Sequence, residues 1–231
     1  MNATKKRFEV VGKARRRVDG RAKALGQCLF ADDLVLPRML HCKLLRSPHP
    51  HAVIEAIDTQ KAATHPGVHL VLTGKDLPIP FGIMPVSLDE YALAPERVRY
   101  VGDPIAAVVA KDEQTAAEAL ELIEVKFKVL RTIADPQEAL QNPEPRIHEY
   151  GEQGNIHRNQ SYEFGDVAEA LAGSDHVFED TFFFEGNTHM AMEQQASLAS
   201  VEGDGKLLLT TSTQNPHYLH RQLSRVLQMP A

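Results

Sequence analysis

The sequence predicts an α+β protein of two domains. Over the first 130 residues, short apolar segments typical of strands alternate with short amphipathic segments typical of helices. Residues 131–160 are rich in Pro, Gly and polar residues, which is typical of a linker that runs over a surface. Further strand and helix patterns follow this linker. A chain of 231 residues is long enough for two modest domains, each with its own core.

Five strands are predicted before the linker. In each of them apolar side chains alternate or continue without Gly or Pro, as in a segment that buries one or both faces in a sheet. Residues 105–110 (IAAVVA) are continuously apolar and small, which indicates a buried strand. Residues 124–130 alternate cleanly and place Val125, Phe127 and Val129 on one side. The predicted strands are residues 39–45, 52–57, 68–72, 105–110 and 124–130.

Helices are predicted where a capping residue precedes an amphipathic segment. One short helix follows such a cap at residues 60–64. Asp112 or Thr115 caps a second helix, which continues to Leu122. Its apolar residues recur at helical spacing and define one buried face. They are Ala116, Ala119, Leu120 and Ile123.

Proline and glycine mark the segments between these elements. Residues 77–96 contain four prolines and no sustained period, so we expect a loop. Gly102, Asp103 and Pro104 predict a turn before the buried strand. Within the linker, only residues 137–141 have a short helical pattern. Residues 1–17 are polar and offer little to bury, which predicts a loosely held tail.

A second domain is predicted beyond the linker. Asp166 precedes a short helix that ends at Leu171. The glycines of residues 202–205 predict a hairpin turn between two strands. Apolar residues at helical spacing predict a last helix over residues 218–227. The strands predicted in this domain are residues 176–184, 196–201 and 207–211.

Composition excludes several classes of partner. The net charge is −6 at pH 7, so there is no electrostatic reason to expect nucleic acid or an anionic membrane. No apolar run of about 18 residues could cross a bilayer, and no secretory leader is evident at the N-terminus. The basic cluster Lys5-Lys6-Arg7 with residues 15–17 favours a solvated tail over a docking strip for an acidic partner.

The cysteines and histidines do not form a metal site by their spacing. Cys28 and Cys42 form no CxxC pair, so they can make neither a zinc nor an iron–sulfur site alone. We therefore expect a reducing, cytoplasmic setting. His49 and His51 flank a proline without a nearby carboxylate, so a structural or interface role is favoured over metal binding.

Four collinear segments resemble the large subunit of the molybdenum hydroxylases, the xanthine dehydrogenase and aldehyde oxidase family. The resemblance covers essentially the whole chain, with Pro50 in place of the usual alanine in the first segment. The segments are residues 19–33 with 45–52 (LRSPHPHA), 98–110 (VRYVGDPIAAVVA), 165–167 with 188–193 (THMAME), and 211–217 (TSTQNPH).

The resemblance implies a domain organisation and a set of cofactors. Residues 18–130 would form the α/β hammerhead domain, after a tail of residues 1–17 and before the linker of residues 131–160. Residues 161–231 would be the truncated start of the first molybdopterin-binding domain. The resemblance also implies molybdenum on a pterin dinucleotide, only partly contacted by this chain, with iron–sulfur clusters and FAD on partner subunits. This chain alone would be inactive, because the resemblance places the catalytic glutamate and the glycine-rich pterin loop beyond residue 231.

Three residues are expected near the cofactor because of the resemblance. It places Gln214 beside the apical oxo group of the molybdenum, where an amide can donate hydrogen bonds without changing the metal's charge. His189 and Glu193 would lie near the pterin pocket. Their i, i+4 spacing would put them on one face of a helix, although the pair lacks the third ligand of a zinc site. For both residues, packing or a supporting role is favoured over direct chemistry.

Within the family, several departures are similar to 4-hydroxybenzoyl-CoA reductase, which removes a phenolic hydroxyl from an aromatic thioester. They are residues 80–85 (PFGIMP), 90–94 (EYALA), Asp103 in place of glutamine, and Gln194 after Glu193. Phe81 and Met84 would then line the channel for the aromatic substrate, because methionine adapts to bulky ligands.

Other functions stay open at this stage. The chain could serve a relative that oxidises an aldehyde, a purine or an N-heterocycle, with electrons leaving the substrate instead of entering it. It could also be a non-catalytic, truncated hammerhead module. No GxGxxG, P-loop, GxSxG or cysteine cluster indicates another enzyme class.

Overall fold

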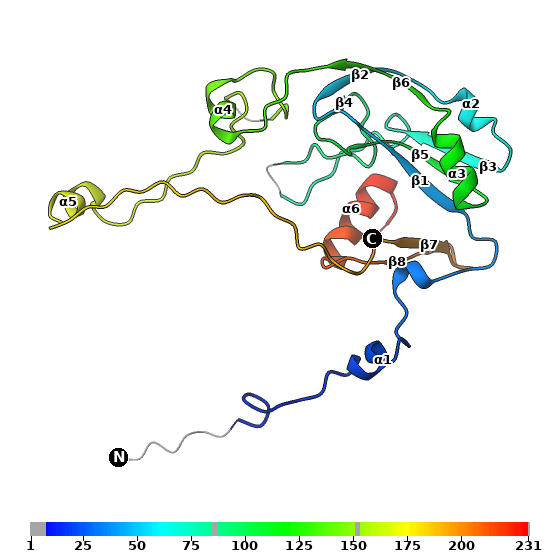
Figure 1. The fold of residues 1–231 in the computed structure, drawn as a ribbon, viewed down its shortest axis with the longest axis horizontal. Coiled ribbons are helices and arrows are strands. Elements are labelled where there is room, and N and C mark those ends of the chain that lie inside the picture. The colour runs from blue at the N-terminus through cyan, green and yellow to red at the C-terminus, as the bar shows by residue number, and fades with distance from the viewer. Residues whose placement is uncertain (1–7, 85–86, 151–152, 231) are drawn as a thin grey trace. The chain divides into compact units, whose positions relative to one another are not determined.

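The computed structural model describes residues 8–84, 87–150 and 153–230. Parts of the predicted tail, loop and linker, including Lys5-Lys6-Arg7, lie outside the described residues. The chain divides into two compact units. The larger contains residues 38–185 with 215–231, and the smaller contains residues 1–37 with 186–214. Figure 1 shows the elements of each.

The larger unit contains two antiparallel sheets of three strands each. The first has the order β1 (His41–Arg46), β5 (Pro104–Ala110) and β3 (Val68–Thr73). The central place of β5 confirms the buried strand that its continuous apolar run predicts. Val108 in its middle has no exposed surface and pairs with Lys43 on one side and Val71 on the other.

The second sheet has the order β4 (Arg97–Val98), β2 (Ala52–Asp58) and β6 (Glu124–Val129). All of its pairs are antiparallel, so both sheets agree with the α+β class that the sequence predicts. The alternation in β6 holds for Val125 and Phe127, which are half-buried, whereas Val129 at the end of the strand is 58% exposed.

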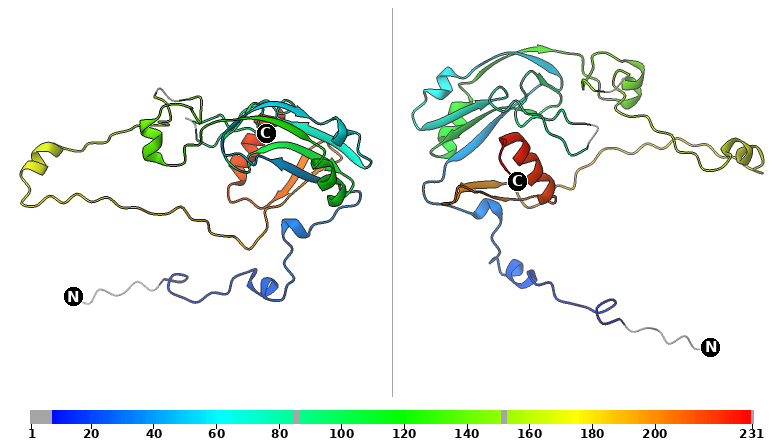
Figure 2. Two further views of the ribbon diagram at one scale, coloured as in Figure 1. Left: turned by 45° about the horizontal axis from the view of Figure 1, so that its top comes forward. Right: turned by 180° about the vertical axis from the view of Figure 1, so that it is seen from behind.

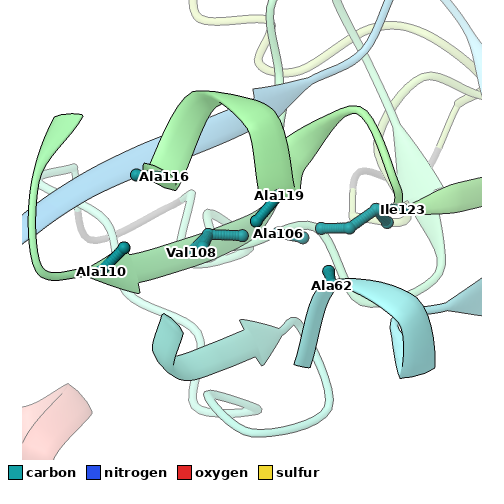
Figure 3. Close-up of a cluster of buried hydrophobic side chains, with 7 residues drawn as sticks. All are labelled: Ala62, Ala106, Val108, Ala110, Ala116, Ala119 and Ile123. Carbon is teal, nitrogen blue, oxygen red and sulfur yellow. The ribbon is translucent and has the colours of Figure 1, made fainter. Parts of the chain in front are cut away.

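Two short helices cover the first sheet. The helix α3 (Glu113–Leu120) contacts β1 and β5, and α2 (Gln60–Ala63) contacts β3. Figure 3 shows the resulting cluster of buried side chains, most of which are alanines. Such small residues let the helix backbone approach the sheet closely, so the core is thin and tightly packed. The cluster comprises Ala62, Ala106, Val108, Ala110, Ala116, Ala119 and Ile123.

The cap of α3 is the predicted one and supports a first test. The Asp112 side chain accepts a hydrogen bond from the backbone N–H of Thr115 at 2.7 Å. Replacing Asp112 with Ala leaves that N–H without its partner, so we expect the free energy of unfolding to fall by about 1 kcal/mol. Replacement with Ser keeps an acceptor and should cost less than half as much. Chemical denaturation of both variants measures the difference, and equal losses would contradict a capping role.

The smaller unit contains a β-hairpin of β7 (Ser197–Val201) and β8 (Leu207–Thr211). The predicted turn is present, because Glu202 donates its N–H to the carbonyl of Lys206 and Gly205 has a φ of +84°. This unit also holds α1 (Gly20–Ala24) and the 3₁₀ turn η1 (Ala31–Asp33), which the sequence pattern did not predict.

The remaining helices are α4 (Pro136–Gln141), α5 (Val167–Ala172) and α6 (Pro216–Leu227). All three were predicted within two residues of their observed bounds. Asp135 and Asp166 cap the first two through their side chains. In the described part of the chain, no helix has the length and apolar character needed to span a membrane.

The prediction of a strand over residues 176–184 is wrong. Residues 156–185 contain only α5 as a helix or strand, apart from an isolated β-bridge at Ile156 (Figure 2). Phe178, Phe182 and Phe184 are each more than 80% exposed. Alternation describes which side chains could share a face, but a strand also needs a partner for its backbone hydrogen bonds. No described segment offers that partner to residues 176–184.

His51 is a buried histidine of the larger unit and gives the fold a dependence on pH. It is 3% exposed, and its Nδ1 lies 3.3 Å from the carbonyl oxygen of Arg131, while Nε2 is buried without a hydrogen-bond partner. Burial lowers the pKa of His51, and the positive charges of Arg97 and Arg99 act in the same direction. The contact with the carbonyl opposes this shift. The neutral imidazole is therefore favoured in the folded state.

We expect His51 to destabilise the protein in acid. The part of the free energy of unfolding that depends on a neutral His51 is fully present above the unfolded-state pKa of about 6.5. It is lost as the pH falls through the lower folded-state pKa. The free energy of unfolding should therefore fall more steeply between about pH 7 and pH 5 in the natural protein than in His51→Gln. Denaturation series at several pH values measure the slopes. The exposed His217 serves as the control, since His217→Gln should keep the natural slope.

Candidate functional site

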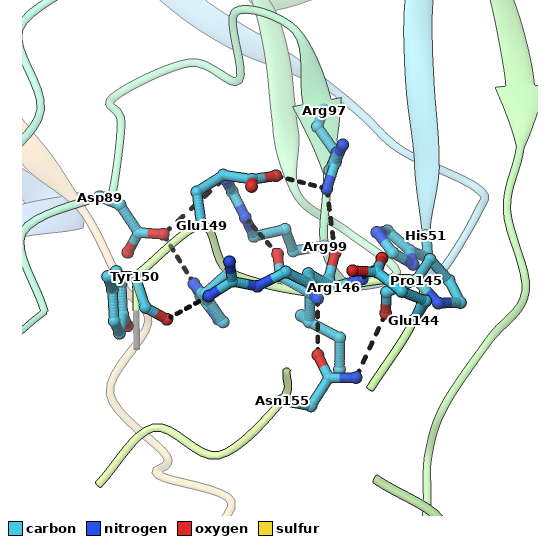
Figure 4. Close-up of polar contacts among 12 residues, drawn as sticks. His51, Asp89, Arg97, Arg99, Glu144, Pro145, Arg146, Glu149, Tyr150 and Asn155 are labelled. Atoms are coloured by element: carbon cyan, nitrogen blue, oxygen red, sulfur yellow. Dashed lines mark hydrogen bonds and ion pairs between the residues drawn. The ribbon is translucent and has the colours of Figure 1, made fainter. Parts of the chain in front are cut away.

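The segment that the sequence predicts as a linker is held against the larger unit by two arginines. Arg99 donates from Nε to the carbonyl of Ile147 at 2.8 Å. Arg97 donates to the carbonyl of Arg146 at 2.9 Å and to the Glu149 carboxylate at 2.8 Å. Figure 4 shows these contacts. Arg97 lies in β4 and Arg99 follows directly after it, so the short strand fixes where the segment docks.

A carboxylate completes this network. Asp89 accepts through Oδ2 from His148 Nδ1 at 2.8 Å, and the same oxygen lies 3.7 Å from Arg99 Nη2. The side chains of Asp89 and Arg99 are only 18% and 16% exposed. Nearby, the hydroxyl of Tyr150 donates to Ser87 Oγ at 2.8 Å. Charges that are this well removed from water need these partners.

The docked segment is folded by its own hydrogen bonds. The Asn155 side chain accepts from the backbone N–H of Ile147 at 2.8 Å and donates to the carbonyl of Asn142 at 3.0 Å. Gly154 has a φ of +53°, and a Cβ there would lie 2.6 Å from Pro143. The turn therefore requires glycine at that position.

A pocket of about 730 Å³ lies between this segment and the loop of residues 77–96. Aromatic and apolar side chains line much of it, and the polar network forms one wall. Its lining includes Phe81, Met84, Asp89, Glu90, Tyr91, Arg99, Tyr100, Asp103, Ile147, His148, Tyr150, Asn155 and His157.

Two lining groups are shifted toward their protonated forms. Burial raises the pKa of the Asp103 carboxyl, although a hydrogen bond from the backbone N–H of Arg99 opposes the shift. Burial also raises the pKa of the Tyr100 hydroxyl, and the nearby Asp103 charge adds to this effect. Partial burial therefore disfavours the charged forms of these two side chains, Asp103 and Tyr100.

Phe81 and Met84, the residues predicted to line a substrate channel, both line this pocket. Phe81 is fixed by reciprocal backbone hydrogen bonds with Glu90, at 2.8 and 3.1 Å. The loop turns tightly at Gly82, where a Cβ would lie 2.1 Å from the carbonyl oxygen of Ser87. Met84 is 55% exposed at the rim, so its side chain is free to adjust to a ligand.

The three residues expected near the cofactor lie in the smaller unit, and all are exposed. Gln214 follows β8 in the turn before α6. The prediction that His189 and Glu193 share a helix face is wrong, because residues 186–195 form no helix and Met190 has a φ of +45°. Among the described residues, no hydrogen bond or ion pair joins these three side chains.

Sequence reasoning missed the residues that build the pocket wall. Asp89, Arg99, His148 and Tyr150 lie in segments without helical or strand periodicity, so no pattern relates them to one another. Only composition could have indicated these residues, because charged and aromatic residues recur in the predicted loop of residues 77–96 and the predicted linker of residues 131–160.

Comparison with known proteins identifies two domains. A family model described as "Aldehyde oxidase and xanthine dehydrogenase, a/b hammerhead domain" matches residues 25–131. A second, described as "Molybdopterin cofactor-binding domain", matches residues 147–231. Residues 132–146 of the docked segment lie between the two matched ranges, and its residues from 147 onward belong to the second.

Curated relatives match along nearly the whole chain. A probable xanthine dehydrogenase subunit of Bacillus subtilis is 41% identical over 94% of this chain and 29% of its own length. A nicotinate dehydrogenase large molybdopterin subunit of Eubacterium barkeri is 37% identical over 97% of this chain and 52% of its own length. The chain thus spans between about a third and a half of these relatives.

Solved structures agree with these matches. Quinoline 2-oxidoreductase from Pseudomonas putida 86 superposes with a TM-score of 0.83 at 30% identity, over 95% of this chain and 29% of that one. A Cu,Mo-CO dehydrogenase superposes with a TM-score of 0.80 at 31% identity, over 95% of this chain and 30% of that one.

A hammerhead domain followed by a molybdopterin cofactor-binding domain defines a class of molybdenum-dependent oxidoreductases. The present chain belongs to the aldehyde oxidase and xanthine dehydrogenase family of that class, and it corresponds to the N-terminal part of the molybdopterin-binding subunit.

Proposed function

We propose that the chain is part of the large subunit of a multi-subunit molybdenum hydroxylase that oxidises a purine or another N-heterocycle. The observation that carries the proposal is the order of the two matched domains, hammerhead and then molybdopterin-binding, in one chain. The substrate class rests on the names of its relatives, which refer to xanthine, nicotinate and quinoline. As part of the proposal, the domain boundaries stay at residues 18–130, 131–160 and 161–231.

The described residues offer suitable groups for the cofactor. Gln214 presents an exposed amide on a turn, so its N–H donors are available to an oxygen-rich group without adding charge. When bound, the molybdenum cofactor supplies the two-electron chemistry, and the protein positions the substrate. In the proposal, Gln214 donates a hydrogen bond to the cofactor, while His189 and Glu193 contact its surroundings from the adjoining segment.

Electrons must leave the cofactor, so partners are part of the proposal. We propose an iron–sulfur subunit and an FAD subunit, together with the downstream part of the large subunit. A cytoplasmic setting follows from the same assignment, because these centres need reduced thiols during assembly. The chain alone should lack activity.

The similarity to 4-hydroxybenzoyl-CoA reductase stays a prediction. It depends on residues 80–85, on Asp103 and on Gln194. The pocket between the loop and the docked segment is compatible with an aromatic substrate, and both a heterocycle-oxidising hydroxylase and the reductase act on one. The two enzymes differ in the direction of electron flow, because the hydroxylase takes electrons from its substrate and the reductase delivers electrons to it.

Co-purification with molybdenum tests the proposal. The chain, expressed with its partner subunits, should carry molybdenum and should reduce an artificial electron acceptor when hypoxanthine or quinoline is added. Reduction of 4-hydroxybenzoyl-CoA by a low-potential donor, without heterocycle oxidation, would instead support the reductase. An assembly without molybdenum would contradict both.

The channel role of Phe81 and Met84 predicts a change in substrate affinity. In the assembled enzyme, the double replacement Phe81→Ala with Met84→Ala should raise KM by about tenfold, since each side chain buries apolar surface against a ligand in the pocket. The value of kcat should change less than KM. Steady-state kinetics measure both, with the exposed Phe164→Ala, outside the pocket lining, as the control. An unchanged KM would exclude the pocket from the substrate's path.

A further inference from the structure

We propose that two copies of this chain associate through two exposed segments, such that a basic strip of each copy binds an acidic arm of the other. The basic strip is residues 13–23, in the smaller unit, and the acidic arm is residues 156–185, in the larger unit. Two identical contacts related by a two-fold axis close the assembly at a dimer. The inference is independent of the proposed function, because it needs neither the cofactor nor a partner subunit.

The acidic arm is an exposed segment with a large excess of negative charge. Every residue from 157 to 185 is exposed, and Arg158 is the only lysine or arginine of the arm. Among the described residues, none of its seven carboxylates takes part in an ion pair. A segment of this kind attracts a cationic surface. The carboxylates are those of Glu163, Asp166, Glu169, Asp175, Glu179, Asp180 and Glu185.

Aromatic side chains in the same arm favour a protein partner over small counter-ions. All five phenylalanines of the arm are more than 80% exposed. Aromatic residues are enriched at protein interfaces, and apolar side chains gathered on an exposed segment are typical of a docking surface. Burial against another polypeptide removes them from water, which small ions cannot do. They are Phe164, Phe178, Phe182, Phe183 and Phe184.

The basic strip carries the complementary charge. It contains six cationic side chains and one carboxylate, Asp19, in a chain whose net charge is −6. Asp19 pairs with Arg17 at 3.3 Å and with Lys23 at 2.6 Å. The other four cations are exposed and form no ion pair with any residue that the structure describes. They are Lys13, Arg15, Arg16 and Arg21.

Apolar side chains in and after the strip favour a polypeptide over nucleic acid or a membrane. Charge alone is compatible with a solvated tail, but Val18, Leu25 and Leu29 are each more than half exposed. The strip contains no aromatic side chain on which a base could stack. Its helix α1 has five residues, too few to present an amphipathic face to a membrane. The fitting partner is a segment with both carboxylates and apolar side chains, and the acidic arm of a second copy has both.

The net negative charge of the chain does not prevent this dimer. At an ionic strength of 0.15 M, charges separated by more than about 8 Å are largely screened, so the distant repulsion between two copies is weak. Each exposed ion pair contributes little on its own. We therefore expect a weak dimer that depends on salt and on protein concentration.

Sedimentation equilibrium of the full chain tests the association. At an ionic strength of about 0.05 M, the chain should show a monomer–dimer equilibrium with a Kd of about 10 µM, as for a weak protein–protein contact. At about 0.5 M the Kd should rise by about tenfold, because salt screens the ion pairs. A chain that stays monomeric well above this concentration, or a dimer whose Kd is independent of salt, would overturn the proposal.

Charge reversal identifies the segments that meet. Replacing the four unpaired cations of the strip by Glu should raise the Kd by more than about tenfold, because the strip and the arm then repel each other. Replacing four carboxylates of the arm by Lys should do the same. The arm positions are Glu163→Lys, Asp175→Lys, Glu179→Lys and Asp180→Lys, and the strip positions are Lys13→Glu, Arg15→Glu, Arg16→Glu and Arg21→Glu.

A matched control separates the strip from the effect of net charge. Four exposed cations outside both segments, replaced by Glu, give the same net charge as the reversed strip and should raise the Kd by less than about threefold. An increase as large as that of the reversed strip would overturn the proposal. The control positions are Lys75, Lys128, Arg221 and Arg225.

Compensation is the decisive measurement. A chain with both the strip and the arm reversed has the natural net charge of −6 and should dimerise again, since opposite charges face each other at both contacts. If that chain fails to fold, an equimolar mixture of the two singly reversed chains gives the same test, because only the mixed dimer pairs opposite charges at both contacts. Absence of the dimer from the compensated chain, or from the mixture, would refute the pairing of strip and arm.

Discussion

Replacing Gln214 with Ala should lower the turnover of the assembled enzyme by about 100-fold, as expected when a donor that acts at the reacting centre is removed. The expectation rests on the proposed contact of Gln214 with the cofactor, which the family resemblance implies, and it requires the amide to be exposed, as it is in the turn between β8 and α6. Because the side chain is exposed, its loss should change the free energy of unfolding by less than about 0.5 kcal/mol. Single-turnover rates with a saturating heterocycle measure the first effect, and chemical denaturation measures the second.

Two further variants separate a cofactor contact from a general effect. Gln214→Asn keeps the amide but shortens its reach, so it should fall between the natural protein and Gln214→Ala. Gln160→Ala removes an exposed amide elsewhere in the chain and should leave turnover unchanged. A natural rate in Gln214→Ala, with full molybdenum occupancy, would contradict the assignment. A low rate that follows a low molybdenum content would indicate a role in cofactor retention instead.

The predictable part of the fold is the part in which local pattern and long-range packing agree. Residues 105–110 are apolar on both faces, and they form the central strand of a covered sheet. Asp112 caps the helix that follows because its side chain reaches the backbone three residues on. Such signals are local, so one sequence is enough to read them.

Sequence prediction is wrong for segments whose secondary structure depends on contacts with other parts of the chain. Residues 176–184 carry the alternation of a strand, yet no described edge pairs with them. His189 and Glu193 have helical spacing, but spacing alone cannot offset the cost of starting a helix. A family resemblance places single residues such as Gln214, and local periodicity cannot test that placement.

The pocket residues could likewise be predicted from the sequence only in part. Phe81 and Met84 were singled out from the loop by resemblance, and both line the pocket. The wall opposite them depends on pairs such as Asp89 with His148, 59 residues apart in the chain. Neither residue belongs to a helix or strand, so only the folded structure relates them.

The contact between Arg99 and Asp89 should dominate the stability of this region. Both side chains are more than 80% buried, so Arg99→Met would leave the Asp89 carboxylate with less compensation in a site that water scarcely reaches. Arg99 also fastens the docked segment at the Ile147 carbonyl. We expect the free energy of unfolding to fall by about 3 kcal/mol, which chemical denaturation at neutral pH measures.

Arg97 is the matched control, because it lies two residues earlier, in β4, and contacts the same segment. Its partner Glu149 is 62% exposed, so water solvates that carboxylate when the arginine is removed. Arg97→Met should therefore cost about 1 kcal/mol or less. The double variant of Arg99→Met with Asp89→Asn should recover part of the loss, since it removes the carboxylate left behind. Equal losses in the two single arginine variants would show that burial of the pair does not decide the stability, and that the docked segment is held by its backbone contacts instead.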